Sequence, residues 1–270
     1  MTTSDNLFAG SIPEVYDRYL VPLIFEVPAR DLVSRLMRME PKHVLETAAG
    51  TGVLTRELAR RLLDSARIVA TDLNQAMLDH AAARQHGDGR ITWQKADALA
   101  LPFPDDSFDA VACQFGVMFF PDKVQGYRDA RRVLKPGGSF VFNVWDRIAE
   151  NEFADVVTQA LEAVFPADPP RFMPRTPHGY HDVEQIRQHL IAAGFASIAV
   201  DTLSGTSRAS SAHDVAIAYC QGTPLRNEIE ARDRSRLKEA TQRSADALAR
   251  KFGSGAVEGR IQAHVITAKR

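Results

Sequence analysis

The feature that most limits the possible folds is an alternation of strand-like and helix-like segments from Lys42 onward. Short apolar runs with many β-branched residues lie at 43–47, 67–72, 91–97, 108–115 and 139–145. Helical stretches separate most of them, at 55–63, 75–85 and 122–134. We expect 135–138 to be a turn that ends the last of these helices and precedes the next strand. Strands and helices that alternate at this spacing build a mostly parallel sheet with helices on both faces. The sequence therefore predicts an α/β fold.

The flanking segments predict additions to this core. Residues 11–39 suggest two helical pieces, interrupted near Pro22 and Pro28. After the fifth strand we expect helices at 151–165 and 182–195, a strand at 196–205, a mainly helical stretch and a final strand at 260–270. We divide the chain into an N-terminal helical flap (1–40), a core (41–207 and 258–270) and a helical insert (208–257) that caps the substrate.

The bulk composition excludes several classes of partner. A net charge of -1 and a pI near 6.7 give no reason to expect nucleic acid or an anionic membrane. The two cysteines, Cys113 and Cys220, lie outside any metal or redox spacing. No secretory signal is apparent, and the longest apolar stretch is too short to span a membrane. We expect a cytoplasmic protein without metal, for which a homodimer is a possible assembly.

The stretch "VLETAAGTGVLTREL" at 44–58 carries the strongest chemical signal. A strand, a loop of small residues and a helix N-terminus together make a candidate nucleotide cradle. The dinucleotide pattern G-x-G-x-x-G lacks its third glycine after Gly50 and Gly52. The pattern acidic-x-Gly-x-Gly-x-Gly fits from Glu46, with Ala48 in place of the first glycine. A strand-to-helix turn without a ligand is the alternative.

Features further along the chain agree with a ligand-binding role. Asp72 ends the second strand, where a carboxylate can accept hydrogen bonds from both hydroxyls of a ribose; capping of the next helix is the alternative, although Asn74 is already a good cap. Asp97 and Ala98 follow the third strand, and an acidic turn precedes the fourth. Each of these positions lies at the carboxyl end of a strand, where open α/β sheets bind ligands.

With these motifs in order, residues 42–145 resemble the class I S-adenosylmethionine-dependent methyltransferases, in particular the small-molecule branch with the ubiquinone/menaquinone methyltransferase-like proteins. The resemblance implies a Rossmann-like seven-stranded sheet in the order 3-2-1-4-5-7-6 with the last strand antiparallel. It also implies S-adenosylmethionine as cofactor and S-adenosylhomocysteine as product. The implied cofactor-binding residues are Tyr19, Glu46, Ala48, Gly50, Gly52, Asp72, Leu73, Asp97, Ala98 and Gln114.

In this resemblance Glu46 and the loop at 48–52 hold the methionine portion. Asp72 binds the ribose, and Leu73 lies beside the adenine. Asp97 meets the exocyclic amine of the adenine, and the backbone of Ala98 meets its ring. Gln114 lies near the methionine moiety or the reacting methyl. Ala48 departs from the family pattern, since a glycine there serves positive φ or close approach. We expect cofactor binding to be retained.

The acceptor site is less clearly marked. Phe115, Met118, Phe119 and Trp145 form an apolar pocket or are plain core. Tyr16 and Tyr19 belong to a flap of the kind that covers the cofactor in related enzymes, or only pack their own helix. His178, Tyr180 and Tyr16 are the candidate catalytic residues. For His181 and Asp182 we expect a helix cap with a bystander histidine.

We therefore expect methyl transfer from S-adenosylmethionine to a small organic molecule, by in-line displacement at the sulfonium methyl. The segment after the fourth strand lacks the Asn/Asp-Pro-Pro-aromatic motif of amino-methylating DNA enzymes. A non-enzymatic cofactor-binding or regulatory protein of the same fold is one alternative. An NAD-dependent dehydrogenase is another, which the missing third glycine opposes.

Overall fold

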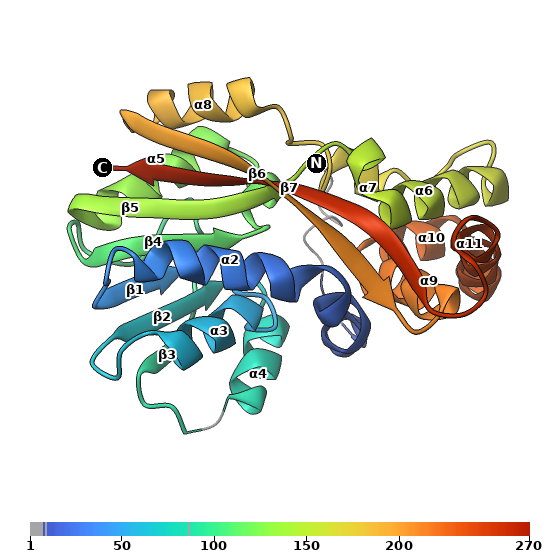
Figure 1. The fold of residues 1–270 in the computed structure, drawn as a ribbon, viewed down its shortest axis with the longest axis horizontal. Coiled ribbons are helices and arrows are strands. Elements are labelled where there is room, and N and C mark those ends of the chain that lie inside the picture. The colour runs from blue at the N-terminus through green and yellow to red at the C-terminus, as the bar shows by residue number, and fades with distance from the viewer. Residues whose placement is uncertain (1–7, 9, 86) are drawn as a thin grey trace. The chain divides into compact units, whose positions relative to one another are not determined.

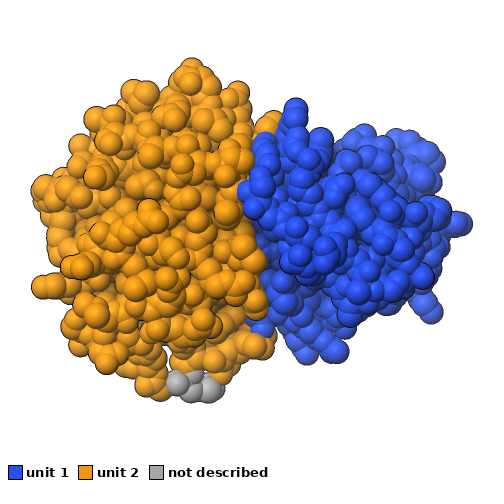
Figure 2. Space-filling view, viewed as in Figure 1, with its two compact units in different colours: residues 1–25, 145–180, 204–262 blue, residues 26–144, 181–203, 263–270 orange. Residues whose placement is uncertain are grey.

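The computed structural model describes residue 8, residues 10–85 and residues 87–270 of the chain. The chain forms two compact units, drawn in different colours in Figure 2. Unit 1 comprises the N-terminal residues up to Phe25, Trp145–Tyr180 and Ser204–Gln262. Unit 2 comprises Glu26–Val144, His181–Leu203 and Ala263–Arg270. The division into flap, core and insert that the sequence suggested stays a prediction.

One seven-stranded sheet organises the fold, in the order β3-β2-β1-β4-β5-β7-β6 (Figure 1). Its strands are β1 (His43–Glu46), β2 (Arg67–Asp72), β3 (Ile91–Lys95), β4 (Phe108–Gln114), β5 (Leu134–Trp145), β6 (Ser197–Ala209) and β7 (Val257–Lys269). β1 pairs in parallel with both β2 and β4, and β2–β3 and β4–β5 are parallel too. The predicted fold and strand order are confirmed.

The last strand runs against its neighbour β5. Arg270 N donates to Gly138 O at the end of β7, while Asp146 N donates to Gln262 O nearer its start, so the partners advance in opposite directions. The sheet of this protein is therefore mixed, with parallel central strands and an antiparallel strand, β7, near one edge. The antiparallel final strand is confirmed.

The faces of the sheet in unit 2 are covered by helices whose apolar sides follow the sequence pattern. α2 (Glu26–Met37) and α3 (Val53–Arg61) bury leucines such as Leu32 and Leu58 in one cluster with Val141 of β5. On the opposite side of β5, Phe140 and Phe142 contact Tyr127 of α5 (Lys123–Val133). α8 (Val183–Ala192) contacts α5, and α4 (Gln75–Arg84) contacts β2 and β3. The alternation along β5 shows that both faces are buried.

Helices dominate unit 1. The predicted helical insert between β6 and β7 contains α9 (Ala212–Gln221), α10 (Leu225–Asp233), the short 3-10 helix η5 (Arg234–Arg236) and α11 (Leu237–Phe252). The other helices described in this unit are α1 (Ile12–Val15), the π-helix η2 (Tyr16–Phe25), η4 (Ile148–Glu150), α6 (Glu152–Val164) and α7 (Phe172–Arg175), and parts of β6 and β7 also belong to it. α11 packs against α9 and α6, which buries Leu248 and Leu161.

Two local predictions were wrong. Pro22 does not interrupt the helical backbone, because it lies inside the π-helix η2. Pro28 likewise lies inside helical backbone, in α2, which follows η2 without a break. The segment at 135–138 was expected to be a turn ahead of a strand. It lies within the bounds of β5 as an irregularity, since Leu134 pairs with Phe108 but Ser139 already with Ala110.

A carboxylate on β4 ties three segments of unit 2 together. Asp109 accepts hydrogen bonds from the backbone N–H of Lys42 (2.9 Å) and His43 (2.7 Å) and an ion pair from Lys135 (2.7 Å). Partial burial raises the pKa of Asp109, but the hydrogen bonds from Lys135, His43 and Lys42 outweigh it and leave the pKa lowered. A lowered pKa means that the ionised carboxylate stabilises the folded state.

We predict that Asp109→Ala lowers the free energy of unfolding at pH 7 by about 1–2 kcal/mol, because several hydrogen bonds to one charged group are lost. The difference from the parent should persist above pH ~4 and shrink as acid protonates the carboxylate. Urea unfolding across this pH range measures it. Asp64→Ala removes a fully exposed carboxylate that lies 3.6 Å from Arg90; it is the control and should change stability little. A pH-independent loss would contradict the assigned role.

Candidate active site

The cradle loop after β1 is built from left-handed backbone. The φ angles of Ala48, Gly50 and Gly52 are 54°, 56° and 79°. Glycine adopts such angles freely, whereas Ala48 bears a strain on the order of 1 kcal/mol. Beside Gly52 there is also no room, since a Cβ there would lie 3.0 Å from the Trp93 ring. The spacing of small residues in the sequence therefore reflects the conformation of this loop.

Glu46 lies beneath the loop and is almost completely buried, with 1% of its surface exposed. Its Oε2 accepts a hydrogen bond of 2.6 Å from Thr55 Oγ1, in the first turn of α3. Burial raises the pKa of Glu46 to about 8; the Thr55 hydrogen bond and the charge of Arg56 oppose this shift, and the charge of Asp72 adds to it. Glu46 is thus largely protonated at neutral pH unless a cation is bound nearby.

Asp72 connects the cradle loop to the end of β2. Its Oδ2 accepts the N–H of Gly50 and its Oδ1 the N–H of Asn74, both at 2.8 Å. Asn74 occupies the N-cap position of α4, yet its side chain makes no capping hydrogen bond, so the expectation of a good Asn74 cap was wrong. Burial raises the pKa of Asp72, and hydrogen bonds from Asn74 and Gly50 counteract it. The carboxylate organises the turn on both sides of it.

The residues that follow β2 and β3 combine an apolar surface with a second carboxylate. Leu73 is 48% exposed, so its side chain offers an apolar surface directly after β2. Asp97 is exposed, and its Oδ1 accepts the N–H of Leu99 at 2.9 Å. Ala98 is half-buried. An exposed leucine next to one carboxylate in the sequence, with a second carboxylate after the neighbouring strand, is suited to a flat apolar ring that carries polar groups.

The loop after β4 packs directly on the cradle. Phe115, which follows Gln114, has a φ of 50°, and its N–H donates to Asn143 Oδ1 of β5 at 2.8 Å. A Cβ on the next residue, Gly116, would lie only 2.4 Å from the Ala48 methyl group. The two loops therefore limit each other's side chains.

The rest of this loop is held by a lysine. Val117–Phe119 form the 3-10 helix η3, in which Met118 is buried and Phe119 half-buried. Lys123 Nζ donates to the carbonyls of Met118 (3.1 Å) and Phe120 (2.6 Å). Burial lowers the pKa of Lys123 to about 8. Met118 is core, whereas Phe119 keeps some exposed surface.

Two residues of this region were missed by the sequence analysis. Asn143 is completely buried in β5 and holds the left-handed turn at Phe115. A polar residue within the apolar run at 139–145 was the available signal. Gly116 is the other, and its role depends on contact with Ala48 and Cys113, which no local pattern reveals.

A second group of candidate residues gathers in unit 1. Tyr16 stacks on Phe25 at a ring separation of 5.1 Å, and Phe25 in turn contacts Trp145 at 6.0 Å. Trp145 contacts His178 at 6.2 Å. Tyr16, Trp145 and His178 thus belong to one aromatic cluster in this unit, although they are far apart in the sequence.

The remaining candidates of unit 1 lie in η2 and in the loop after α7. Tyr19 is half-buried, and the Arg18 guanidinium lies 5.0 Å above its ring. Tyr180 is buried. His178 Nδ1 lies 2.8 Å from the backbone carbonyl oxygen of Asp146. Because a carbonyl oxygen only accepts, Nδ1 carries the proton and donates, and in the neutral ring Nε2 is the basic nitrogen.

Some expectations concern residues outside these groups. Asp182 caps α8 by accepting from the N–H groups of Glu184 and Gln185, so the predicted cap is confirmed. Within the described residues, no group of His, Cys, Asp and Glu side chains could hold a metal ion. No helix in the same part of the chain combines the length and apolar character needed to cross a membrane.

Comparison with known proteins assigns the family. A family model described as a methyltransferase domain matches residues 44–138. A demethylmenaquinone methyltransferase from Deinococcus radiodurans is 33% identical over 62% of this chain and 73% of its own length. The chain belongs to the class I S-adenosylmethionine-dependent methyltransferases. The match to the ubiquinone/menaquinone biosynthesis C-methyltransferase UbiE of Proteus mirabilis, at 35% identity, covers 50% of this chain and about half (51%) of that protein.

A solved structure agrees at the level of the fold. The phosphoethanolamine N-methyltransferase 2 of Haemonchus contortus, in complex with S-adenosyl-L-methionine, superposes with a TM-score of 0.56 at 16% identity. The match covers 97% of this chain and 60% of that one. The protein with the present sequence uses S-adenosylmethionine as its cofactor and methylates a small molecule. The dehydrogenase and non-enzymatic alternatives are not favoured.

The buried Glu46 predicts a pH-dependent stability. Its pKa in the folded state, about 8, lies above the value near 4.5 of an exposed glutamate, so its contribution to stability is complete below pH ~4.5 and is lost as the pH rises through 8. Relative to the parent, the free energy of unfolding of Glu46→Gln should increase by on the order of 2–4 kcal/mol between pH 5 and pH 9. Urea unfolding of both proteins measures this difference. A difference that stays constant with pH would show that Glu46 is ionised throughout.

The contact between Ala48 and Gly116 predicts non-additive mutations. Gly116→Ala alone should lower the free energy of unfolding by about 1–3 kcal/mol, because its methyl group overlaps the Ala48 methyl and the Cys113 sulfur. In the Ala48→Gly background the loss should be smaller by about 1 kcal/mol, since one of the two clashes is gone. Ala48→Gly alone should bind S-adenosylhomocysteine as well as the parent or better. Strict additivity in the double-mutant cycle would contradict the proposed contact.

Proposed function

We propose that the carboxyl edge of the sheet in unit 2 binds S-adenosylmethionine through the residues that the sequence suggested. Asp72 accepts the ribose hydroxyls, Leu73 packs on the adenine, and Asp97 accepts from its exocyclic amine. The loop at 48–52 and Glu46 hold the methionine portion, with Gln114 near the reacting methyl. The observation that carries this proposal is the Asp72 carboxylate, held between the N–H groups of Gly50 and Asn74 beside an exposed leucine.

The donors and acceptors present fit this cofactor. Each oxygen of Asp72 accepts one backbone hydrogen bond and retains further acceptor capacity for a hydroxyl. Gly50 leaves open space, since a Cβ on it would contact only the end of Met77 at 4.0 Å. The buried Thr51 Oγ1 has no hydrogen-bond partner among the described residues, and such a hydroxyl is usually satisfied by protein, water or ligand. S-adenosylmethionine has no pyrophosphate, so the loop does not need the third glycine of the dinucleotide pattern.

When bound, S-adenosylmethionine supplies an electrophilic methyl group on a sulfonium centre. The protein therefore has to orient a nucleophile and exclude water rather than activate the methyl group. We propose that Phe115 and Phe119, with their apolar neighbour Met118, favour an acceptor with an apolar body. The relatives named as demethylmenaquinone and ubiquinone/menaquinone methyltransferases make a quinol-like ring one candidate.

We propose His178 as the base that removes a proton from a weakly acidic acceptor. Its Nδ1–H is fixed on the Asp146 carbonyl, which orients the ring and sets the tautomer of its neutral form. Trp145, whose ring contacts that of His178 within unit 1, stays a prediction as a wall of the acceptor site. Tyr16 and Tyr180 stay predictions as further catalytic residues, and Tyr19 as a cofactor contact.

The cellular setting also remains a proposal. Two free and buried cysteines agree with a reducing cytoplasm, where we expect the enzyme to act. The near-neutral net charge agrees with a small-molecule acceptor rather than nucleic acid. A homodimer is a possible assembly, for which light scattering is the test.

Asp72→Ala tests the cofactor site. The variant loses the acceptor for two ribose hydrogen bonds and the hydrogen bond from Gly50 in the cradle loop. The binding free energy for S-adenosylhomocysteine should therefore become less favourable by on the order of 2–3 kcal/mol. Isothermal titration calorimetry measures it, with NAD(H) as a ligand that neither protein should bind. Asp79→Ala is the matched control, because this carboxylate on α4 is exposed and accepts a hydrogen bond from Gln75 Nε2. Equal affinity of parent and Asp72→Ala would mean that the ribose lies elsewhere.

A further inference from the structure

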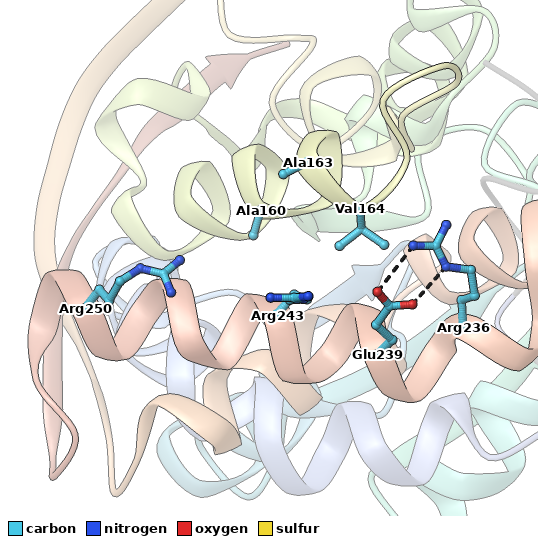
Figure 3. Close-up of a pocket in the computed structure, with 7 residues that line it drawn as sticks. All are labelled: Ala160, Ala163, Val164, Arg236, Glu239, Arg243 and Arg250. Atoms are coloured by element: carbon cyan, nitrogen blue, oxygen red, sulfur yellow. Dashed lines mark hydrogen bonds and ion pairs between the residues drawn. The ribbon is translucent and has the colours of Figure 1, made fainter.

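A groove of about 360 Å³ lies in unit 1, between α6 and α11. Figure 3 shows its two walls, with small side chains of α6 above and long charged side chains of η5 and α11 below. Its lining residues are Ala160, Ala163, Val164, Arg236, Glu239, Arg243 and Arg250. The alanines leave room that larger residues on α6 would fill. None of these residues belongs to the cofactor site described above.

The three arginines of the groove recur every seven residues, at 236, 243 and 250. On an α-helix this spacing is close to two turns, so the side chains share one face. The Cα atoms of Arg243 and Arg250, both on α11, are separated by about 10.5 Å along the helix axis. The groove thus presents a row of cationic groups on one wall, opposite an apolar wall formed by α6.

The arginines differ in how they are neutralised. Arg236 pairs with both carboxylate oxygens of Glu239, at 2.9 and 3.3 Å, and lies over the ring of Phe165. Within residues 10–85 and 87–270, neither Arg243 nor Arg250 forms an ion pair or a hydrogen bond, although the charge of Arg243 acts at longer range on Glu239, four residues before it. Glu239 is the single carboxylate in the lining and is already engaged. The groove therefore keeps an excess of positive charge.

An ordinary solvent-exposed helix would pair these charges along its own surface. Asp246 lies four residues before Arg250, the favourable order for an ion pair. Its Oδ1 instead accepts from Gln242 Nε2 at 2.9 Å, and the Arg250 side chain lines the groove. The helix thus forgoes an available i,i+4 pair.

We propose that this groove binds a small organic polyanion with at least two phosphate groups. Guanidinium groups bind phosphate in bidentate fashion, and Arg243 and Arg250 can each take one phosphate. The volume lies within the range of small-molecule sites, and the apolar wall of Ala160, Ala163 and Val164 suits an apolar portion of the ligand. This site is separate from methyl transfer and does not rest on the proposed function.

Calorimetric titration of the full chain with sodium pyrophosphate at low ionic strength tests the proposal. The Arg243→Ala/Arg250→Ala double variant should bind pyrophosphate at least about ten-fold more weakly than the parent. Lys238→Ala removes a charge of the same helix outside the groove and should leave the affinity unchanged within about two-fold. Glu239→Gln releases Arg236 and should strengthen binding.

Further measurements separate this site from its alternatives. Both arginines are exposed, so the double variant should fold, and it should bind S-adenosylhomocysteine like the parent. Failure of the parent to bind pyrophosphate, or equal binding by the double variant, would overturn the proposal. The proposal would also be overturned if the protein sedimented with phosphatidylglycerol vesicles in an arginine-dependent way but did not bind pyrophosphate. That result would mark a membrane-facing surface instead.

Discussion

The proposed cofactor site depends on one carboxylate that has two tasks. Asp72 ends β2, and its two oxygens accept the N–H groups of Gly50 and Asn74. It therefore fixes the turn after β1 relative to the start of α4 before any ligand arrives. A site in which the ligand-binding group also holds its surroundings is preorganised, so less ordering is required on binding.

The general architecture was predictable because each segment carries a periodic signal. The β-branched runs and the helices between them indicate a parallel sheet, and the left-handed loop at 48–52 follows from its small residues. Strand order is different. All central strands are buried on both faces and read alike, so the order 3-2-1-4-5-7-6 came from resemblance to a family and not from the residues.

What escaped prediction is long-range or depends on tertiary context. Asn143 belongs to β5 but acts on the turn after β4, and Gly116 is required by the methyl group of Ala48. Such contacts join residues that no local window includes. Pro22 was misjudged because local rules assume an α-helix, whereas η2 has π-type turns. Positions such as Asp72 and Asp97 were identifiable, but not the backbone groups that they hold.

The contact between Ala48 and Gly116 has a consequence for how such enzymes diverge. A methyl group on the first loop occupies the space that a side chain on the second would need. A lineage could therefore acquire a residue larger than glycine at 116 more readily after 48 has become glycine. The order of substitutions matters, and an alanine in the glycine pattern restricts the later history of a loop more than sixty residues away in the sequence.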